Sequence, residues 1–253
     1  AGMDGIEIEA YGHFLDSFWS PATNKRKDSF GGSLDNRTRF SIKVIDSIRK
    51  RVGNDFIVGM RLVADEDWEI GLSKEEGLKI VKKIVDTNKV DFLNIIRGHI
   101  DTDSALTKVI PIQGMASAPH LDFAGQIKQE TKFPIFHASK INDVATARHA
   151  IATGKLDMVG MTRAHIADPH IIKKITEGNE ERIRPCVGAT YCLDRIYEGN
   201  ETLCIHNPAT GRESYMPHEI IKKADKKKNI VVVGAGPAGL EAARVCSSRG
   251  HNV

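Results

Sequence analysis

Three cysteines are the most distinctive reactive side chains of this sequence. Cys186 and Cys192 lie close together, and Cys204 follows further along the chain. Thiolates are soft ligands, and close cysteines followed by a more distant one suit an iron–sulfur cluster. Ala189 stands where a fourth thiolate would be expected, so the residues leave open a three-iron cluster, a four-iron cluster with a non-cysteine ligand, zinc, or no metal. Cys246 is expected to pack as a small hydrophobic side chain.

Basic residues form a second chemical pattern. Ser139-Lys140 and Thr162-Arg163 each follow an apolar, strand-like segment. If these segments are the last two strands of a barrel, the loops after them are the usual place for a phosphate. The sequence therefore predicts a phosphate site that contains both Lys140 and Arg163.

Arg61 ends an apolar segment that would otherwise be fully buried. A buried guanidinium needs a partner. The pyrimidine edge of a flavin, which gains negative charge on reduction, is one suitable partner. Carboxylates of the barrel such as Glu7 or Glu9 are the alternative.

Gly234, Gly236 and Gly239 form a Gly-x-Gly-x-x-Gly motif between a β-branched segment and a helical one. In that context glycines let the backbone approach a pyrophosphate at a helix N-terminus, which predicts a dinucleotide site. The acidic residue that separates FAD from NAD(P) would lie about 20 residues beyond the motif, past Val253. A tight turn without a ligand is the alternative.

Tyr11 and His13 lie just past the first predicted strand. Tyrosine and histidine commonly handle protons in catalysis, so both are predicted to contact a substrate or move a proton. Ordinary packing is the alternative for each residue taken alone. His99 and His137 also sit at strand ends and are weaker candidates.

Strand-like and helix-like segments alternate along the first two thirds of the chain and position these residues. Strands are predicted near residues 6–9, 56–62, 90–96, 133–137 and 156–161, and helices near residues 34–52, 74–86, 121–130 and 143–153. Ser33 and Ser73 are predicted N-caps. This alternation indicates an α/β protein with a parallel sheet, either doubly wound or part of a (β/α)8 barrel. A further strand is expected at 229–233, before a helix at 239–248.

We expect four regions: residues 1–182 as strands 4–8 of a TIM barrel, 183–215 as the cysteine loop, 216–228 as a linker, and 229–253 as the start of a dinucleotide-binding domain. The ends of the sequence suggest a piece cut from a longer protein. Of its 253 residues, 41% are hydrophobic and 27% are charged, and its net charge is +3. The small net charge argues against a nucleic-acid partner, and the lack of a run of about 18 apolar residues argues against a membrane span. The clustered cysteines favour the cytoplasm.

The segment from Asn24 to Arg37 and the preceding Asp4–Ile8 and Gly12–Leu15 together resemble the Old Yellow Enzyme family. With the cysteine loop and the glycine motif, the chain resembles the multi-cofactor branch of that family, which includes 2,4-dienoyl-CoA reductase, trimethylamine dehydrogenase and N-demethylases. The resemblance implies FMN in the barrel, a neighbouring iron–sulfur cluster of the 4Fe-4S or 3Fe-4S type, and FAD and NAD(P)H in the C-terminal region.

The resemblance also implies residue roles. Arg61 would face the flavin ring, whereas the flavin phosphate would be bound by Ser139, Lys140, Thr162 and Arg163. Cys186, Cys192 and Cys204 would match three of the four cluster ligands. The segment Glu9–His13 departs from the family pattern because it is one residue shorter there, and it looks most like a subgroup that demethylates small N-methylated amino acids.

The favoured function is hydride transfer between FMN and a small organic substrate, with relay through the cluster and FAD. Oxidative demethylation of N-methylated amines or amino acids comes first, and reduction of enones or 2,4-dienoyl-CoA is the alternative. A non-enzymatic electron-transfer flavoprotein and a zinc-stabilised structural module are hypotheses of other classes. Its partner would be a small-molecule substrate, and a homo-oligomer is left open.

Overall fold

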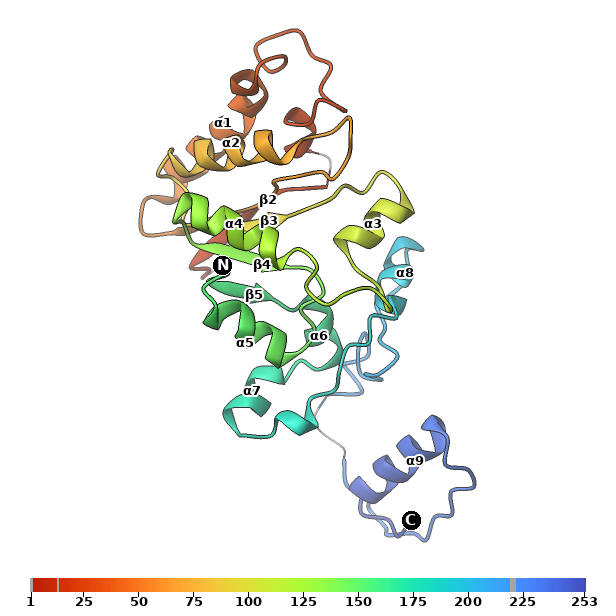
Figure 1. The fold of residues 1–253 in the computed structure, drawn as a ribbon. Helices are drawn as coiled ribbons and strands as arrows, with labels where there is room; N and C mark the ends of the chain where they lie inside the picture. The colour runs from red at the N-terminus through yellow and green to blue at the C-terminus, as the bar shows by residue number, and fades with distance from the viewer. Residues whose placement is uncertain (1, 13, 219–221) are drawn as a thin grey trace. The chain divides into compact units, whose positions relative to one another are not determined.

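The computed structural model describes residues 2–12, 14–218 and 222–253. Contacts within the chain divide it into two compact units, Ala1–Thr190 and Tyr191–Val253. The first unit is built around a sheet with helices packed along it (Figure 1). Within the described residues, no helix is both long and apolar enough to cross a membrane.

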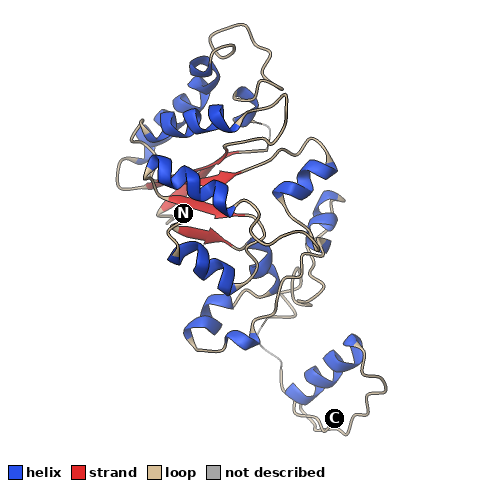
Figure 2. Ribbon diagram, in the orientation of Figure 1, coloured by secondary structure: helices blue, strands red, loops and turns tan. Residues whose placement is uncertain are grey.

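The sheet, red in Figure 2, consists of parallel strands. It has five strands, and their spatial order follows their order in the sequence. The strands are β1 (Gly5–Ala10), β2 (Ile57–Val63), β3 (Phe92–Ile96), β4 (Ile135–Ala138) and β5 (Met158–Gly160). Each strand pairs only with its neighbours in the sequence, as consecutive strands of a (β/α)8 barrel do. The predicted parallel sheet is therefore confirmed.

Helices connect the successive strands of this unit, and two further helices follow β5. They are α1 (Leu34–Val52), α2 (Lys74–Val85), α3 (Asp103–Val109), α4 (Leu121–Thr131), α5 (Val144–Ala152), α6 (Thr162–Ala167) and α7 (Ile171–Thr176). The predicted caps are confirmed, because the Ser33 hydroxyl accepts a hydrogen bond from the Asn36 N–H and the Ser73 hydroxyl accepts one from the Glu76 N–H. Each cap satisfies an N–H group that the first helical turn leaves without a partner.

The two faces of the sheet differ in chemistry. One face packs against the helices, and its cross-strand row of Ile8, Met60, Leu93 and Ile135 lies in the main hydrophobic core. We call the opposite side the inner face. It carries the side chains of Glu7, Glu9, Arg61, Phe92, Asn94, Phe136 and Met158, together with Gly59. The alternation arises because successive side chains of a strand point to opposite faces.

Close packing on the inner face depends on one glycine. A Cβ atom added to Gly59 would lie 2.0 Å from the ring of Phe92. The Phe92 ring in turn stacks on Phe136, with ring centroids 4.2 Å apart. The missing side chain at position 59 therefore makes room for an aromatic pair that spans β3 and β4.

The second unit contains α8 (Tyr191–Tyr197) and α9 (Pro237–Ser248). The strand predicted at 229–233 is wrong for the described structure, where only an isolated bridge joins Asn229 to Asn252. The side chains of Val231 and Val233 are exposed, at 87% and 95%. A strand needs neighbouring backbone for its hydrogen bonds, and within the described chain this segment has only Asn252 beside it.

Candidate functional site

Arg61 lies on the inner face near the C-terminal end of β2. Its Nε atom is 3.8 Å from Oε1 of Glu9, which is longer than a hydrogen bond. That Nε–H is buried and makes no hydrogen bond within the described chain, although the side chain as a whole is 34% exposed. The predicted carboxylate partner is thus present, but it leaves a buried donor for a further acceptor. An acceptor such as the pyrimidine edge of a flavin fits this position.

Asn94 was not anticipated from the sequence. It is paired with Arg61 across the sheet, and its Nδ2 donates a 2.9 Å hydrogen bond to Oε1 of Glu7. The Oδ1 atom of Asn94 is buried and accepts no hydrogen bond from the described residues. A polar residue inside an otherwise apolar strand was the available signal. Its meaning depends on the strand register, because only the register places it beside Arg61.

Glu9 completes this polar group on the inner face. Burial raises the pKa of Glu9 above its usual value; the Arg61 guanidinium opposes the shift, and the Glu7 carboxylate adds to it. This polar group can present carboxylate acceptors, one guanidinium and one amide to a ligand on this face. Its members are Glu7, Glu9, Arg61 and Asn94. The carboxyl ends of parallel strands are where barrel enzymes place their chemistry.

The two predicted basic side chains meet at one segment of the chain. Lys140 Nζ donates hydrogen bonds to the carbonyl oxygens of Ile112, at 2.6 Å, and Met115. Arg163 Nη2 donates to the carbonyl oxygen of Pro111 at 2.9 Å. Arg163 Nη1 is buried with no hydrogen-bond partner in the described structure. Two positively charged side chains thus lie after the ends of β4 and β5, and one of them has a donor that no described residue uses. This arrangement suits a phosphate group, and the binding of a phosphate there stays a prediction.

The neighbouring predicted residues have smaller parts in this arrangement. Ser139 is buried, and its hydroxyl donates a 3.3 Å hydrogen bond to the carbonyl oxygen of Val109. Thr162 is the first residue of α6. Tyr11 directly follows β1 and packs against the hydrophobic core. His13 lies outside the described residues, so its predicted role with Tyr11 stays a prediction.

A second polar cluster at the strand ends contains His99, which the sequence indicated as a weaker candidate, together with partners that were not anticipated. Arg97 follows β3 and forms ion pairs of 2.8 Å with Asp65 and with Asp67. Beside it, the rings of Trp68 and His99 are stacked with centroids 4.4 Å apart. Partners of these side chains come from the loops after β2 and β3, which the sequence does not show to be adjacent. The cluster supplies a flat aromatic surface next to paired charges.

His137 is a core residue. Its side chain is 1% exposed, and the register pairs it with Ile95 on the helix-covered face of the sheet. Nδ1 lies 2.7 Å from the carbonyl oxygen of Ile95, which can only accept, so the ring donates from Nδ1. Burial lowers the pKa of His137 to about 4. The ring is therefore neutral near pH 7 and has a structural role in the sheet.

The predicted metal ligands are divided between the two compact units. Cys186 belongs to the first unit, whereas Cys192, in α8, and Cys204 belong to the second. All are half-buried and free of disulfides. Across the described ranges, no three His, Cys, Asp or Glu side chains gather as a group able to hold a metal ion. Three thiolates with Ala189 at the fourth place are an incomplete donor set for a four-iron cluster, so the cluster stays a prediction.

The glycine motif is explained position by position. Gly234 has a φ of +111°, a conformation that L side chains rarely adopt. A Cβ atom at Gly239 would lie 2.0 Å from the carbonyl oxygen of Gly234, so this position allows a close turn. Gly236 caps α9 and has nothing within 4 Å of an added Cβ atom. The first and third glycines are thus required by the fold, while the second leaves open space before a helix N-terminus, where a dinucleotide is predicted.

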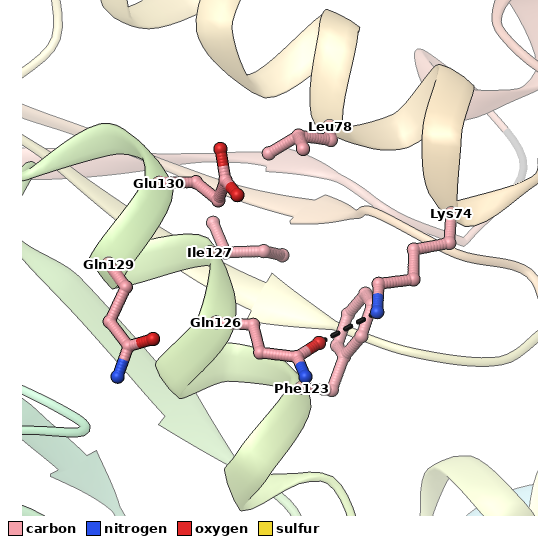
Figure 3. Close-up of a pocket in the computed structure, with 7 residues that line it drawn as sticks. All are labelled: Lys74, Leu78, Phe123, Gln126, Ile127, Gln129 and Glu130. Carbon is pink, nitrogen blue, oxygen red and sulfur yellow. Dashed lines mark hydrogen bonds between the residues drawn. The ribbon is translucent and has the colours of Figure 1, made fainter.

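A surface pocket lies on the helix-covered side of the sheet, where the guanidinium of Arg97 is 5.7 Å from the ring centroid of the lining residue Phe123. It is lined by α2 and α4, and Lys74 at its edge donates a 2.7 Å hydrogen bond to Oε1 of Gln126 (Figure 3). Phe123 and Ile127 form its apolar floor. Both helices cover the outer face of the sheet, so this pocket does not contribute to the inner-face site.

Comparisons with known proteins bear on this geometry. The profile of the NADH:flavin oxidoreductase / NADH oxidase family matches residues 1–182. The chain is 64% identical over 252 residues to a probable N-methylproline demethylase of Rhizobium meliloti (strain 1021), covering 100% of this chain and 37% of that protein. It is 46% identical over 254 residues to the N,N-dimethylglycine/sarcosine dehydrogenase of Chromohalobacter salexigens, covering 100% of this chain and 37% of that protein.

Among solved structures, a complex of 2-naphthoyl-CoA reductase with 2-naphthoyl-CoA is similar with a TM-score of 0.90 and 35% sequence identity. That match covers 100% of this chain and 38% of the reductase. The chain therefore spans little more than a third of the length of the relatives it matches.

Proposed function

Because this chain belongs to the NADH:flavin oxidoreductase / NADH oxidase family, we propose that it forms the FMN-contacting part of an enzyme that oxidises N-methylated amines or amino acids. The observation that carries the proposal is the pair of unsatisfied arginine donors, Arg61 Nε and Arg163 Nη1, at the C-terminal ends of the barrel strands. FMN would supply the acceptor for the hydride that leaves the substrate carbon.

The residues of this chain would bind and orient that cofactor. Arg61 would donate a hydrogen bond to the pyrimidine edge of the flavin and stabilise the negative charge that reduction places there. Arg163 would donate to the phosphate through Nη1, and Lys140 would add a second positive charge. Charge-assisted hydrogen bonds of this kind are shorter and stronger than neutral ones. They would hold the ring and the phosphate at separate points and fix the orientation of the flavin.

The substrate class follows from the relatives. Similarity to a probable N-methylproline demethylase and to an N,N-dimethylglycine/sarcosine dehydrogenase supports oxidation of a methylated amino acid. The second candidate is reduction of an enone or an unsaturated acyl-CoA, which the likeness to 2-naphthoyl-CoA reductase favours. Electrons would pass between FMN and NAD(P)H through the cysteine cluster and an FAD at the glycine motif.

Steady-state turnover by the full-length protein tests this proposal. We expect N-methylproline or dimethylglycine to be oxidised with release of formaldehyde, and 2,4-dienoyl-CoA to be a poor substrate. Turnover of the thioester alone would reverse the order of the two candidates. Absence of any turnover by a flavin-loaded protein would favour an electron-transfer flavoprotein instead. An absorbance and EPR spectrum of the same sample would report flavin and cluster together.

A further inference from the structure

We propose that Glu9 holds the ammonium group of a cationic substrate and accepts its proton before hydride transfer. This inference rests on the proposed function and names the residue that selects the substrate's charge. It assigns to a carboxylate on the inner face a role separate from that of the arginines that would bind the cofactor.

Glu9 lies close to the position expected for the flavin. Glu9 lies on the inner face of β1 one residue before the strand ends, and the register places it directly beside Arg61. It therefore stands at the same edge of the sheet as the guanidinium that would face the flavin. A group bound over the flavin at this edge would also face the Glu9 carboxylate.

The inner face carries more negative than positive charge. Among its described side chains, Glu7 and Glu9 are acidic and Arg61 alone is basic, which leaves one negative charge in excess. Glu7 is engaged by the Asn94 amide at 2.9 Å, whereas Arg61 approaches Glu9 only to 3.8 Å. The Glu9 side chain remains 59% exposed, and among the described residues no charged group within hydrogen-bond distance donates to it. An excess carboxylate with this exposure favours a cationic ligand over an anionic thioester.

The chemistry of amine oxidation gives this carboxylate a task. A protonated amine has no lone pair to stabilise the cation that forms when hydride leaves its methyl group. The nitrogen must first pass its proton to a base, here the Glu9 carboxylate, which becomes a carboxylic acid. With the nitrogen lone pair free, a bound oxidised FMN would supply the acceptor for the hydride that leaves the methyl carbon. Water adds to the resulting iminium carbon and releases formaldehyde, the secondary amine and a proton.

The surroundings of Glu9 suit a base that must both ionise and accept a proton. Burial, Glu7 and Asp16 raise its pKa, whereas Arg61 and the backbone at Tyr11 oppose the shift. A pKa above the ordinary carboxyl value brings the base closer to the operating pH, which improves general base catalysis.

The test compares Glu9→Gln with the control Glu130→Gln in the full-length, flavin-loaded protein. Glu130 lies in α4, on the helix-covered side of the sheet, where its carboxylate pairs with Lys82. The binding probe is N,N-dimethylproline, which keeps the positive charge but has no N–H and cannot be demethylated by this route. Its Kd is read from the visible absorbance of the flavin. We expect Glu9→Gln to raise this Kd about fivefold, as the loss of one partly screened charge pair worth about 1 kcal/mol implies, and Glu130→Gln to leave it within the error of the measurement.

A second readout separates proton acceptance from charge recognition. In the wild type, kcat with N-methylproline should fall as the pH drops below the pKa of Glu9, and this acid limb should vanish in Glu9→Gln. Glu9→Asp keeps a carboxylate and should retain the limb with a weaker Kd, which provides a second variant if the amide does not fold. An unchanged Kd together with an unchanged acid limb in Glu9→Gln would overturn the inference while leaving the demethylase activity in place. If the wild type demethylates nothing but Glu9→Gln still weakens binding of the probe, the proposed function fails and cation recognition by Glu9 stands.

Discussion

Replacing Arg163 with methionine should weaken FMN binding strongly while leaving the fold intact. The substitution removes a guanidinium that, within the described residues, makes one hydrogen bond, to the carbonyl oxygen of Pro111, and has a buried Nη1 donor with no partner there. Methionine fills similar space without a charge. The loss of the Pro111 hydrogen bond should cost about 1 kcal/mol of stability, which a folded protein of this size tolerates.

The effect on the cofactor should be larger than the effect on folding. A hydrogen bond to a charged group contributes about 1.5–3 kcal/mol, and every ~1.4 kcal/mol corresponds to a factor of ten in affinity. Loss of one bond from Nη1 to a phosphate oxygen therefore predicts an FMN Kd about 10- to 100-fold higher. Arg163→Lys keeps the charge without the forked donors and should give an intermediate Kd.

The assay is titration of the deflavinated full-length protein with FMN, followed by quenching of the flavin fluorescence. Lys155→Met is the matched control, because Lys155 precedes β5 at the opposite edge of the sheet and forms an ion pair with Asp122. This control should bind FMN as the wild type does. An Arg163→Met protein with an FMN Kd within twofold of the wild-type value would refute the phosphate assignment.

Two further predictions concern pH and the glycine motif. The lowered pKa of His137 means that its stabilising contribution is complete above pH 6.5 and is lost as the pH falls towards 4, by about 3 kcal/mol in total. Calorimetric Tm values of the full-length protein should therefore drop more steeply over this range than those of His137→Gln, and parallel curves would contradict the assignment. Gly239→Ala should lower the Tm, because its Cβ would meet the Gly234 carbonyl oxygen and overpacking costs about 1–3 kcal/mol. Gly236→Ala should keep the wild-type Tm but lose bound dinucleotide, and a full FAD content in that variant would argue against the predicted site.

The helices were largely predictable from local sequence. The predicted bounds of α1 match the structure at both ends, because an apolar period of 3.6 residues and the Ser33 cap lie within the same short stretch. The same signals located α2. Helices α3 and α6 were missed, since each is too short to display a period. Helix α8 was also not predicted, because it lies within the segment that was interpreted as a cysteine loop.

Properties that depend on distant partners were harder to predict. Asn94 became part of the site only through its register with Arg61, which no local pattern encodes. The expected strand at 229–233 has strong β propensity, but propensity does not supply the neighbouring backbone that a strand requires. By contrast, the approach of Lys140 and Arg163 to one chain segment could be predicted, because parallel strands in a barrel place their C-terminal ends at one edge.

The empty position at Gly59 has a consequence for how this sequence can vary. The Phe92 ring occupies the volume that a side chain at position 59 would need. The side chains at the two positions therefore compete for the same volume, and a larger side chain at one position requires a smaller one at the other. Any redesign of the barrel interior should therefore change residues 59 and 92 together, so that a large side chain at one position always faces a small one at the other.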